Sequence, residues 1–362
     1  MRVAIIGGGF SGLACAHELE RLGVRPDIFE KNGFIGEPIN HVTAVLEVSH
    51  RPIKDSLRYF NDEFQIRIEP LSKLTSLVHF SPHVKTTVKG NNLGYLLENT
   101  SSPTSIKQQL LKQLKTSRIR LNEAADPLKL KKDYDYVVVA NGNYSFPYEA
   151  GVWQEWLQSY IMGAVVYGSF DPEALLMWLN KDYCKNGYAY LTPFNKDKAA
   201  LILVVTDVNE KEIDYYWDLF LYSENIKYAI GEEFKMEHRA GYVYPHIIEN
   251  IIMIGNTGGG LDPFLGFGHF NAIVSGVSAA RTIAGGIDYE KQIKSIMNRN
   301  NDMRQFRNVF NTLSNRGYDN ILTAMKLPGL RYFLYNFPVG VNFVKIGGIA
   351  SRLILKRNQL GR

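Results

Sequence analysis

Apolar runs and glycine-rich breaks divide the start of the chain into short elements. Residues 1–6 form an apolar run that is typical of a buried parallel strand. The run ends in the glycine-rich stretch 7–12, and an amphipathic stretch from Phe10 to Leu22 predicts a helix. A second apolar segment, 26–29, then leads into Glu30. The pattern therefore predicts a strand, a tight turn, a helix and a second strand.

Three glycines with the spacing G-x-G-x-x-G lie at this turn: Gly7, Gly9 and Gly12. Gly7 permits the tight turn, Gly9 lets the backbone approach a pyrophosphate, and Gly12 lets the helix pack closely against the strand. The N-terminus of the helix offers free N–H groups and a positive dipole end to phosphates. Glu30 lies where a carboxylate can accept hydrogen bonds from ribose hydroxyls. These features together predict a dinucleotide-binding unit.

Two later segments also carry an apolar run that ends in a polar, glycine-containing turn. Residues 135–139 lead into Ala140-Asn141-Gly142, and residues 251–254 lead into Gly255-Asn256. The second turn continues through a glycine-rich loop into a helical stretch at 270–284. An NAD-dependent dehydrogenase normally completes its nucleotide domain in one continuous block. Assembly from three separated segments instead suits a long ligand such as FAD.

The stretches between these three segments indicate a second domain. Residues 51–102 show β-like alternation, and residues 151–245 contain several further strands. Two helical stretches are predicted there, near 172–179 and 210–221. We therefore expect an α/β fold in which a Rossmann-like FAD-binding domain is interleaved with an antiparallel, α+β substrate domain and followed by a helical region. The expected boundaries are 1–50, 103–150 and 246–290 for the FAD-binding domain, 51–102 and 151–245 for the substrate domain, and 291–362 for the C-terminal, basic and apolar region.

The composition is that of an ordinary globular protein, with 45% hydrophobic and 21% charged residues among 362. Cys15 and Cys184 provide neither a disulfide framework nor the spacing of metal ligands, so we expect no metal site. The N-terminal apolar run is interrupted by three glycines and continues into charged residues, unlike a signal peptide. We therefore expect a cytoplasmic protein.

The charge is unevenly distributed near the C-terminus. Residues 320–362 contain seven Lys and Arg and no Asp or Glu, interspersed with apolar and aromatic residues. The uncharged stretch 332–344 is too short to span a bilayer. Two interpretations remain open: this segment packs on the substrate domain, or it lies on an anionic membrane surface at the inner face. Nucleic acid is not an expected partner, because the chain contains no recognisable nucleic-acid-binding motif.

Four landmarks, in this order, resemble those of flavoproteins with the fold of para-hydroxybenzoate hydroxylase, and most closely the geranylgeranyl reductase branch. They are G-x-G-x-x-G with Glu30, then Ile35-Gly36-Glu37-Pro38, then 140–142, and then the loop and helix start at 255–276. The resemblance covers about residues 1–290. It implies FAD-dependent reduction of isolated double bonds in prenyl chains by hydride transfer from reduced flavin.

The resemblance also implies which residues surround the cofactor. The cofactor-binding residues expected from it and from the motifs are Gly7, Gly9, Phe10, Ser11, Gly12, Glu30, Lys31, Pro38, Ala140, Asn141, Gly142, Gly255, Asn256, Asp262, Pro263, Gly266, Gly268 and His269. Three have a simpler alternative: Asp262 and Pro263 can merely initiate a turn, and His269 can be an ordinary polar residue at the helix start. Asn256 stands where the branch usually has Asp, and Asn can still hydrogen-bond a ribityl hydroxyl.

His41 is the candidate catalytic residue, because it falls where the branch places a cysteine that this chain lacks. An imidazole can donate a proton near neutral pH, or His41 can simply be a hydrogen-bonded loop residue that holds the flavin. Tyr188, Tyr190 and Phe194 echo the aromatic motif of the branch and are candidate substrate contacts, with ordinary sheet packing as the alternative. Lys107 is expected on a solvated helix face.

The leading function is thus an FAD-dependent oxidoreductase that reduces a prenyl or other apolar lipid chain. One alternative is a flavin-dependent aromatic monooxygenase on the same fold. A second is a flavin-containing lipid-binding protein without turnover. No separate NAD(P)H domain is evident in the sequence, so the expected external electron donor is of unknown identity.

Overall fold

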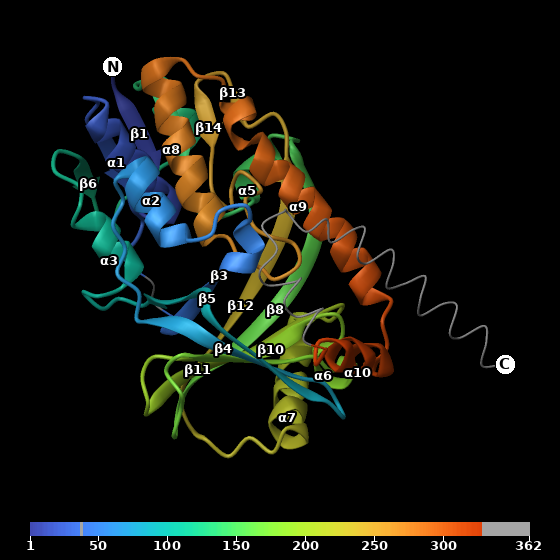
Figure 1. Cartoon of the computed structure of the whole chain (residues 1–362). Coiled ribbons are helices and arrows are strands. Elements are labelled where there is room, and N and C mark those ends of the chain that lie inside the picture. Colours follow the sequence, from blue (N-terminus) through green and yellow to red (C-terminus); the bar gives the residue numbers. More distant parts are fainter. Residues whose placement is uncertain (37–38, 328–362) are drawn as a thin grey trace.

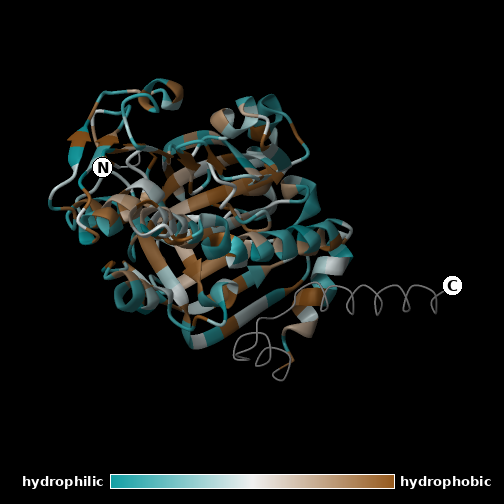
Figure 2. Ribbon diagram, turned by 90° about the horizontal axis from the view of Figure 1, so that it is seen from above, coloured by the Kyte–Doolittle hydropathy of each residue, from teal (hydrophilic) through white to brown (hydrophobic). Residues whose placement is uncertain are grey.

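Two sheets, one above the other in Figure 1, form the framework of the chain. The computed structural model describes residues 1–36 and 39–327. The six-stranded sheet has the strand order β13-β14-β7-β1-β2-β6, and the eight-stranded sheet has the order β12-β8-β11-β10-β9-β4-β5-β3. Figure 2 shows hydrophobic residues on the strands and on the inner faces of the helices, and hydrophilic residues on the outer helices and loops.

The six-stranded sheet contains the strands predicted for the dinucleotide-binding unit. Its members are β1 (Val3–Ile6), β2 (Pro26–Phe29), β6 (Arg118–Arg120), β7 (Tyr136–Val139), β13 (Ile247–Ile248) and β14 (Ile251–Met253). β1 pairs in parallel with β2 and β7, and β7 pairs in parallel with β14. Three separated stretches of the chain therefore meet side by side in one sheet, and the expected Rossmann-like α/β architecture is confirmed.

Two long helices cover this sheet and pack closely against each other: α1 (Phe10–Arg21) and α8 (His269–Gly285). The close approach depends on a glycine of α8: a Cβ atom on Gly276 would lie 2.3 Å from the carbonyl oxygen of Ser11 in α1. A second glycine, Gly12, lets α1 pack on the turn after β1, because a Cβ atom there would lie 2.1 Å from the carbonyl oxygen of Gly7. The shorter helices on this half are α2 (Ser56–Phe64), which packs on α8, α3 (Ile106–Leu111), α4 (Pro127–Leu130) and α5 (Ser145–Glu149).

The eight-stranded sheet forms the other half of the molecule. Its strands are β3 (His41–Leu46), β4 (Ser72–Phe80), β5 (Lys85–Asn99), β8 (Trp153–Tyr167), β9 (Ala174–Trp178), β10 (Tyr188–Pro193), β11 (Lys198–Thr206) and β12 (Ala229–Val243). Its connections contain η1 (Glu47–His50), α2 (Ser56–Phe64), α6 (Lys181–Cys184), η2 (Glu210–Glu212) and α7 (Ile213–Ser223). Strand β3 pairs with β5, so residues 41–46 lie in this sheet, although they were expected to belong to the FAD-binding segment 1–50.

One expected helix is wrong. Residues 172–179 were expected to be helical, but β9 occupies most of that range and pairs with both β10 and β4. The sequence Ala-Leu-Leu-Met-Trp is compatible with a helix, and the neighbouring strands override that preference.

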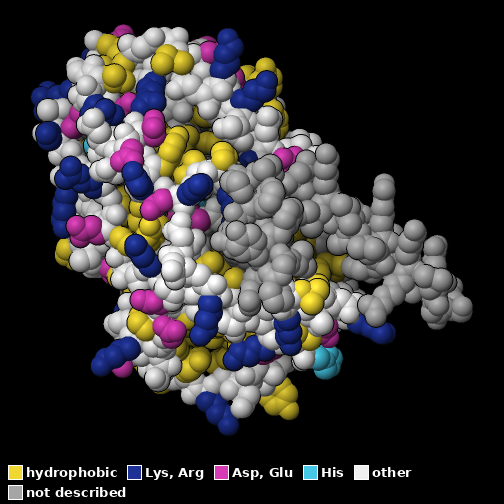
Figure 3. Space-filling model, in the orientation of Figure 1, with side chains coloured by type: hydrophobic (Ala, Val, Ile, Leu, Met, Phe, Trp, Pro, Cys, Tyr) yellow, Lys and Arg dark blue, Asp and Glu magenta, His cyan; other side chains and the backbone are white. Residues whose placement is uncertain are grey.

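Helices α9 (Tyr289–Asn311) and α10 (Asn315–Ala324) follow the two sheets. Figure 1 shows α9 running from the top of the first half down along the second half. On the face drawn in Figure 3, hydrophobic side chains are visible in hollows near the middle of the molecule, with Lys and Arg side chains around them. No helix within the described residues is both long and apolar enough to cross a membrane. The segment 320–362, which was expected either to pack on the substrate domain or to lie on an anionic membrane surface, lies largely outside those residues.

Candidate cofactor and substrate site

A cavity of about 680 Å³ lies where the two halves of the molecule meet. One end is lined by the glycine-rich turn and the turns after β2 and β7, and the other end by the face of the eight-stranded sheet. Ligand cavities typically have volumes of about 300–1,000 Å³ and occur at domain interfaces and at the carboxyl ends of parallel strands. The position and size of this cavity make it the main candidate site.

The turn between β1 and α1 is shaped by glycine. Gly7 has a φ of +109°, and a Cβ atom there would lie 2.6 Å from the carbonyl oxygen of Ala140. A side chain at this position would therefore clash with the turn after β7. Gly9, by contrast, lines the cavity, and a Cβ atom on it would meet only the Ala140 oxygen, at 3.8 Å. The backbone at Gly9 is thus open to a ligand on the cavity side.

Two helix N-termini meet at this cavity. Helix α1 begins after Gly9 and α8 begins after Gly268, and neither has a side-chain cap on its first N–H groups. Uncapped N–H groups and the positive end of a helix dipole favour bound anions. The cavity therefore offers two separate places for negative charge, one at the turn after β1 and one beside His269.

Glu30 lies at the end of β2 and lines the cavity. Its Oε2 accepts a hydrogen bond from the Gly8 N–H (2.9 Å), and its Oε1 accepts one from the Asn32 N–H (2.9 Å). The carboxylate therefore fixes the glycine-rich turn, and each oxygen retains a further lone pair for a ligand hydroxyl. Lys31 and the stretch 123–125 line the cavity beside it.

The turns after β7 and β14 are tied together beside the cavity. Asn141 Oδ1 accepts hydrogen bonds from Thr257 Oγ1 (3.0 Å) and from the Asn143 N–H (3.1 Å). Gly255 has a φ of +60°, and a Cβ atom on it would lie 2.5 Å from Ser11 Oγ. Gly255 is thus required for close packing against α1 and does not itself line the cavity, whereas Asn256 does.

The Asp262-Pro263 pair lies differently from the expectation. Asp262 is buried, and its Oδ1 accepts the backbone N–H groups of Phe264 (2.6 Å) and Leu265 (3.0 Å). Burial raises the pKa of this carboxyl. Neither Asp262 nor Pro263 lines the main cavity. Asp262 therefore shapes the loop, and it is the following residues, 264–269, that reach the cavity.

His41 lies at the start of β3 and lines the cavity. Its Nδ1 is 3.4 Å from the carbonyl oxygen of Ile39, and its Nε2 is 3.1 Å from Asn99 Nδ2. Both ring nitrogens therefore have protein partners, which fixes the orientation of the ring. His41 therefore lines the cavity, as expected, and Asn99 at the end of the neighbouring strand β5 holds its ring.

His269 and His238 line the cavity as neutral imidazoles. Burial, with smaller contributions from His41 and Lys107, lowers the pKa of His269 to about 3. Burial also lowers the pKa of His238 to about 4. His269 Nδ1 lies 3.2 Å from Thr43 Oγ1, so the first residue of α8 is attached to β3. These histidines can hydrogen-bond a ligand without adding charge.

Lys107 is the clearest departure from the sequence analysis. It was expected on a solvated helix face, but only 8% of it is exposed and it lines the cavity. Its Nζ donates to the Gly36 carbonyl oxygen (3.2 Å) and lies 5.3 Å from the centre of the Phe10 ring. A cation therefore lies at the wall of the cavity near the N-terminus of α1.

The region of the cavity above the eight-stranded sheet is apolar. Its lining comes from four strands and from the loop before α8: Leu157, Ile161, Tyr188, Tyr190, Ile202, Val204, Phe234, Met236, Leu261, Phe264, Leu265 and Phe267. The Tyr188 hydroxyl donates to the carbonyl oxygen of Leu265, which joins the sheet to the loop. Phe194, the third expected aromatic contact, does not line the cavity and packs beside Lys198, whose Nζ lies 4.4 Å from its ring centre.

Most expected site residues therefore converge on one cavity, with named exceptions. Gly12, Gly255, Asp262, Pro263 and Phe194 do not line it, and Pro38 lies outside the described residues. The sequence analysis missed Asn99, Lys107, His238 and Phe234. These residues come from strands and from a helix that reach the cavity only in the folded chain, and no local motif marks them.

The residues present fit a flavin dinucleotide. An elongated ligand with an anionic centre needs free N–H donors for its phosphates, and the uncapped N-terminus of α1 provides them. It needs an acceptor for hydrogen bonds from its ribose hydroxyls, which is Glu30. It also needs space for a planar ring, which the cavity between the loop 264–269 and the sheet provides. The bare backbone at Gly9 leaves the approach to the phosphates open.

Comparison with known proteins supports this assignment of the fold. The family model of the NAD(P)-binding Rossmann-like domain matches residues 5–62. A geranylgeranyl bacteriochlorophyll reductase-like protein from Thermoplasma acidophilum is similar in structure, with a TM-score of 0.75 and 16% sequence identity over 96% of this chain and 98% of that one.

Two further solved structures carry other activities on the same fold. A flavin-dependent brominase has a TM-score of 0.67 and 17% identity over 99% of this chain and 100% of its own. A variant of 2-methyl-3-hydroxypyridine-5-carboxylic acid oxygenase has a TM-score of 0.54 and 14% identity, covering 93% of this chain and 96% of its own. At sequence identities of 14–17%, these structural similarities establish the fold only. FAD as the cofactor is consistent with that fold. The chain therefore has the α/β fold of these flavin-dependent proteins, with a Rossmann-like dinucleotide-binding domain at its N-terminal end.

Proposed function

We propose that this protein binds FAD and uses it to reduce carbon–carbon double bonds in a prenyl-type or other apolar lipid chain. The proposal is supported by one observation: the two ends of the same cavity are lined by different kinds of residue. One end has the donors and the acceptor that a dinucleotide needs, and the other end is lined mainly by apolar and aromatic side chains of the sheet and the loop, with a few polar residues such as Ser159 and His238 among them.

The residues of the chain have separate tasks in this proposal. The N-terminus of α1 binds the pyrophosphate, and Glu30 accepts hydrogen bonds from the adenosine ribose. The N-terminus of α8 and neutral His269 bind the polar edge of the flavin ring, where the dipole stabilises negative charge. When bound and reduced, FAD supplies a hydride.

An isolated double bond offers no carbonyl group for the protein to polarise. The apolar lining therefore acts by holding the chain in one orientation and by excluding water. The second carbon of the double bond needs a proton, and His41 is the proposed donor. Because its ring nitrogens contact Ile39 and Asn99, proton transfer from His41 requires one of these contacts to be exchanged for a contact to the substrate.

The proposal leaves the electron donor as an external carrier of unknown identity. A lipid substrate also supports the proposal that the basic, apolar segment 320–362 contacts an anionic membrane surface.

An anaerobic experiment tests the function. The flavin is reduced without oxygen, and geranylgeraniol or a phenol is then added while the flavin absorbance is recorded. Reoxidation by the prenyl alcohol, with a saturated product, supports the proposal. If the prenyl alcohol leaves the flavin reduced, but oxygen admitted in the presence of the phenol yields a hydroxylated phenol, the protein is an aromatic monooxygenase instead. Lipid binding without any reoxidation identifies a flavin-containing lipid-binding protein.

A further inference from the structure

Helix α9 packs along the connection 254–268, which joins β14 to α8 and contributes residues 256, 261 and 264–268 to the lining of the main cavity. Two polar side chains of α9, Asn300 and Arg307, contact this connection and are buried, with 1% and 6% of their surfaces exposed. They are seven residues apart, or about two helical turns, so they lie on one face of α9. The helix therefore holds the connection at two levels.

Asn300 holds the first part of the connection. Its Nδ2 donates to the carbonyl oxygens of Gly259 (3.1 Å) and Leu261 (3.2 Å). Its Oδ1 accepts a hydrogen bond from Asn271 Nδ2 (3.3 Å), which also donates to the Gly260 carbonyl oxygen (2.8 Å). Three successive carbonyl oxygens are thereby fixed from helices α8 and α9.

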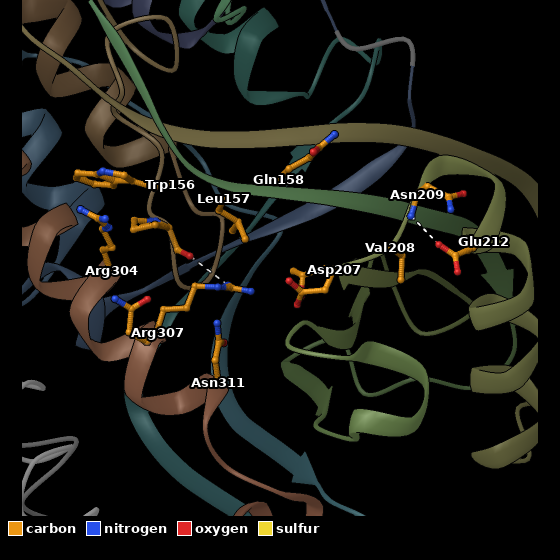
Figure 4. Close-up of a pocket in the computed structure, with 13 residues that line it drawn as sticks. Trp156, Leu157, Gln158, Asp207, Val208, Asn209, Glu212, Arg304, Arg307 and Asn311 are labelled. Carbon is orange, nitrogen blue, oxygen red and sulfur yellow. Dashed lines mark hydrogen bonds between the residues drawn. The ribbon is translucent and has the colours of Figure 1, made fainter.

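Arg307 holds the second part and attaches it to the eight-stranded sheet. Its Nη1 donates to the carbonyl oxygens of Pro263 and Phe264 (3.1 Å each). Its Nη2 donates to the carbonyl oxygen of Asn186 (2.9 Å), between α6 and β10. Figure 4 shows the Arg307 side chain extending from α9, with one hydrogen bond of its guanidinium drawn as a dashed line. The fixed fork of guanidinium donors suits three acceptors that belong to two different segments.

Asp262 binds the same two peptide groups from the opposite side. Its Oδ1 accepts hydrogen bonds from the N–H groups of Phe264 (2.6 Å) and Leu265 (3.0 Å). The C=O and N–H of a trans peptide group point in opposite directions. The peptide groups 263–264 and 264–265 therefore each lie between the Arg307 guanidinium and the Asp262 carboxylate, which fixes the orientation of both. Phe264 and Leu265 then line the cavity.

The charge of Arg307 is costly to bury at this place. It forms no ion pair with any residue in 1–36 or 39–327, and its Nε has no hydrogen-bond partner there. Burial lowers the pKa of its guanidinium, and the charges of Asp207 and Asp262 offset part of that effect. A buried charge is tolerated when its donors are hydrogen-bonded. The hydrogen bonds to the connection 254–268 therefore stabilise Arg307, and the position of that connection depends on Arg307 in turn.

We propose that Arg307 is a positioning residue of the flavin site: it holds the loop 264–269 against the eight-stranded sheet and thereby determines where the flavin ring rests. The inference deepens the proposed function and rests on its claim that FAD binds in the main cavity. The proposed sites for the pyrophosphate and the adenosine ribose, at the N-terminus of α1 and at Glu30, lie at the other end of that cavity. Loosening of the loop should therefore release the ring while the dinucleotide stays bound.

Two methionine variants on the same helix test this proposal. Arg307→Met removes the charge and the donors and retains much of the side-chain volume. Arg304→Met is the matched control, because Arg304 lies three residues earlier on α9 with its guanidinium 5.0 Å from the centre of the Trp156 ring. No hydrogen bond joins Arg304 to the connection 254–268 in the part of the chain that the structure describes. Hydrogen exchange is measured without FAD, and FAD affinity and the decay of flavin fluorescence anisotropy are measured with it.

The expected effects are local to the loop and the flavin ring. In Arg307→Met, amide hydrogens in peptides that cover 259–268 should exchange at least about 10-fold faster than in the wild type, with peptides from β1 and α1 unchanged. FAD affinity should fall by no more than about 10-fold, because α1 and Glu30 still bind the other end. The flavin ring should gain a rapid motion, on a time scale of about 1 ns, that is absent from the wild type and from Arg304→Met. Arg307→Lys, which keeps the charge with fewer donors, should lie between wild type and Arg307→Met.

The contrary outcomes are equally specific. Faster exchange of the loop with an unchanged anisotropy decay would restrict Arg307 to packing and overturn the proposal. Faster exchange throughout the chain, or a loss of FAD affinity above about 10-fold, would overturn it too, because the effect would then not be confined to the ring. If Arg307→Met does not fold, Arg307→Lys decides by the same criteria.

These measurements need no lipid and no turnover. The positioning role therefore stands on its own if the flavin ring is released as expected but prenyl lipids fail to reoxidise reduced flavin, in which case the reductase proposal alone is wrong. Conversely, reoxidation by prenyl lipids together with wild-type anisotropy in Arg307→Met would retain the function and overturn this inference. A wild-type protein that binds no FAD would contradict both.

Discussion

Gly276 of α8 lies directly against the backbone of Ser11 in α1: a Cβ atom on Gly276 would be 2.3 Å from the Ser11 carbonyl oxygen. The same atom would lie 3.0 Å from the Cys15 N atom, one turn further along α1. This contact lets the two helices cross closely, and it thereby brings both uncapped N-termini to one cavity.

Replacement of this glycine should therefore disturb stability and cofactor binding together. We expect Gly276→Ala to lower the free energy of unfolding by about 1–3 kcal/mol, because the helix backbones must move apart. FAD affinity should fall as well. Gly285→Ala is the matched control: it lies at the end of the same helix, where a Cβ atom would meet only the Ile287 side chain, at 3.8 Å or more. Thermal unfolding and flavin titration measure both effects, and equal behaviour of the two variants would contradict the packing argument.

Removal of the Glu30 carboxylate should weaken FAD binding. Glu30→Ala removes the proposed ribose acceptor and also the acceptor of the Gly8 and Asn32 N–H groups. We expect a loss of about 1.5–3 kcal/mol in binding free energy, the size of a charge-assisted hydrogen bond. Flavin fluorescence titration measures it, with Glu149→Ala, at the exposed end of α5, as the control. Unchanged affinity in Glu30→Ala would show that the ribose binds elsewhere.

His41 can be tested as an acid separately from its role in orientation. General acid catalysis typically contributes about 10²–10⁴-fold to a rate. If His41 supplies the proton, His41→Gln should slow reoxidation of the reduced flavin by geranylgeraniol at least about 100-fold, with FAD affinity retained. A loss below about 10-fold would restrict His41 to holding the ligand.

Acid should destabilise the protein through its buried histidines. Burial lowers the pKa of His50 to about 3, and this ring stacks on Phe270, with no hydrogen-bond partner for its Nδ1 among the described residues. Between about pH 6.5 and pH 3 the unfolded chain binds a proton that the folded His50 does not, so stability falls as the pH falls. His50→Phe should reduce the slope of unfolding free energy between about pH 6 and pH 5 by up to about 1.4 kcal/mol per pH unit.

An exposed histidine provides the control for that experiment. The His83 side chain is 82% exposed and pairs with Asp319 (Nδ1 to Oδ2, 2.9 Å), so His83→Gln shows how much the loss of a surface histidine pair alone changes the slope. Urea unfolding at several pH values measures both slopes. A His50→Phe slope equal to that of the wild type would show that His50 does not contribute.

The features of the site that could be predicted from the sequence are those formed by residues that lie close together in the chain. The turn at Gly7 requires a positive φ, and the strand before it and helix after it are contiguous with it. Ala140 and Asn256 follow apolar strands in the same way, so their position at the carboxyl edge of a parallel sheet was predictable.

The features that could not be predicted depend on contacts between distant segments. β9 has the composition of a helix but lies between β10 and β4, where pairing decides its structure. In the sequence, Lys107 resembles an ordinary surface lysine. In the folded chain, α3 places its ammonium group against the Gly36 carbonyl oxygen and the Phe10 ring. His238 reaches the cavity from β12, and no local pattern in the sequence marks it.

The order of the three segments in the six-stranded sheet also determines when during biosynthesis the cofactor can be captured. β1 and α1 come early in the chain, but β14, which pairs with β7, and α8, which packs on α1, end only at residues 253 and 285. The apolar β1 is therefore unpaired on one side until β7 (Tyr136–Val139) is made, and α1 lacks its packing partner until α8 is made. Loading with FAD is consequently a late event, and a nascent chain halted before α8 has half of a binding site.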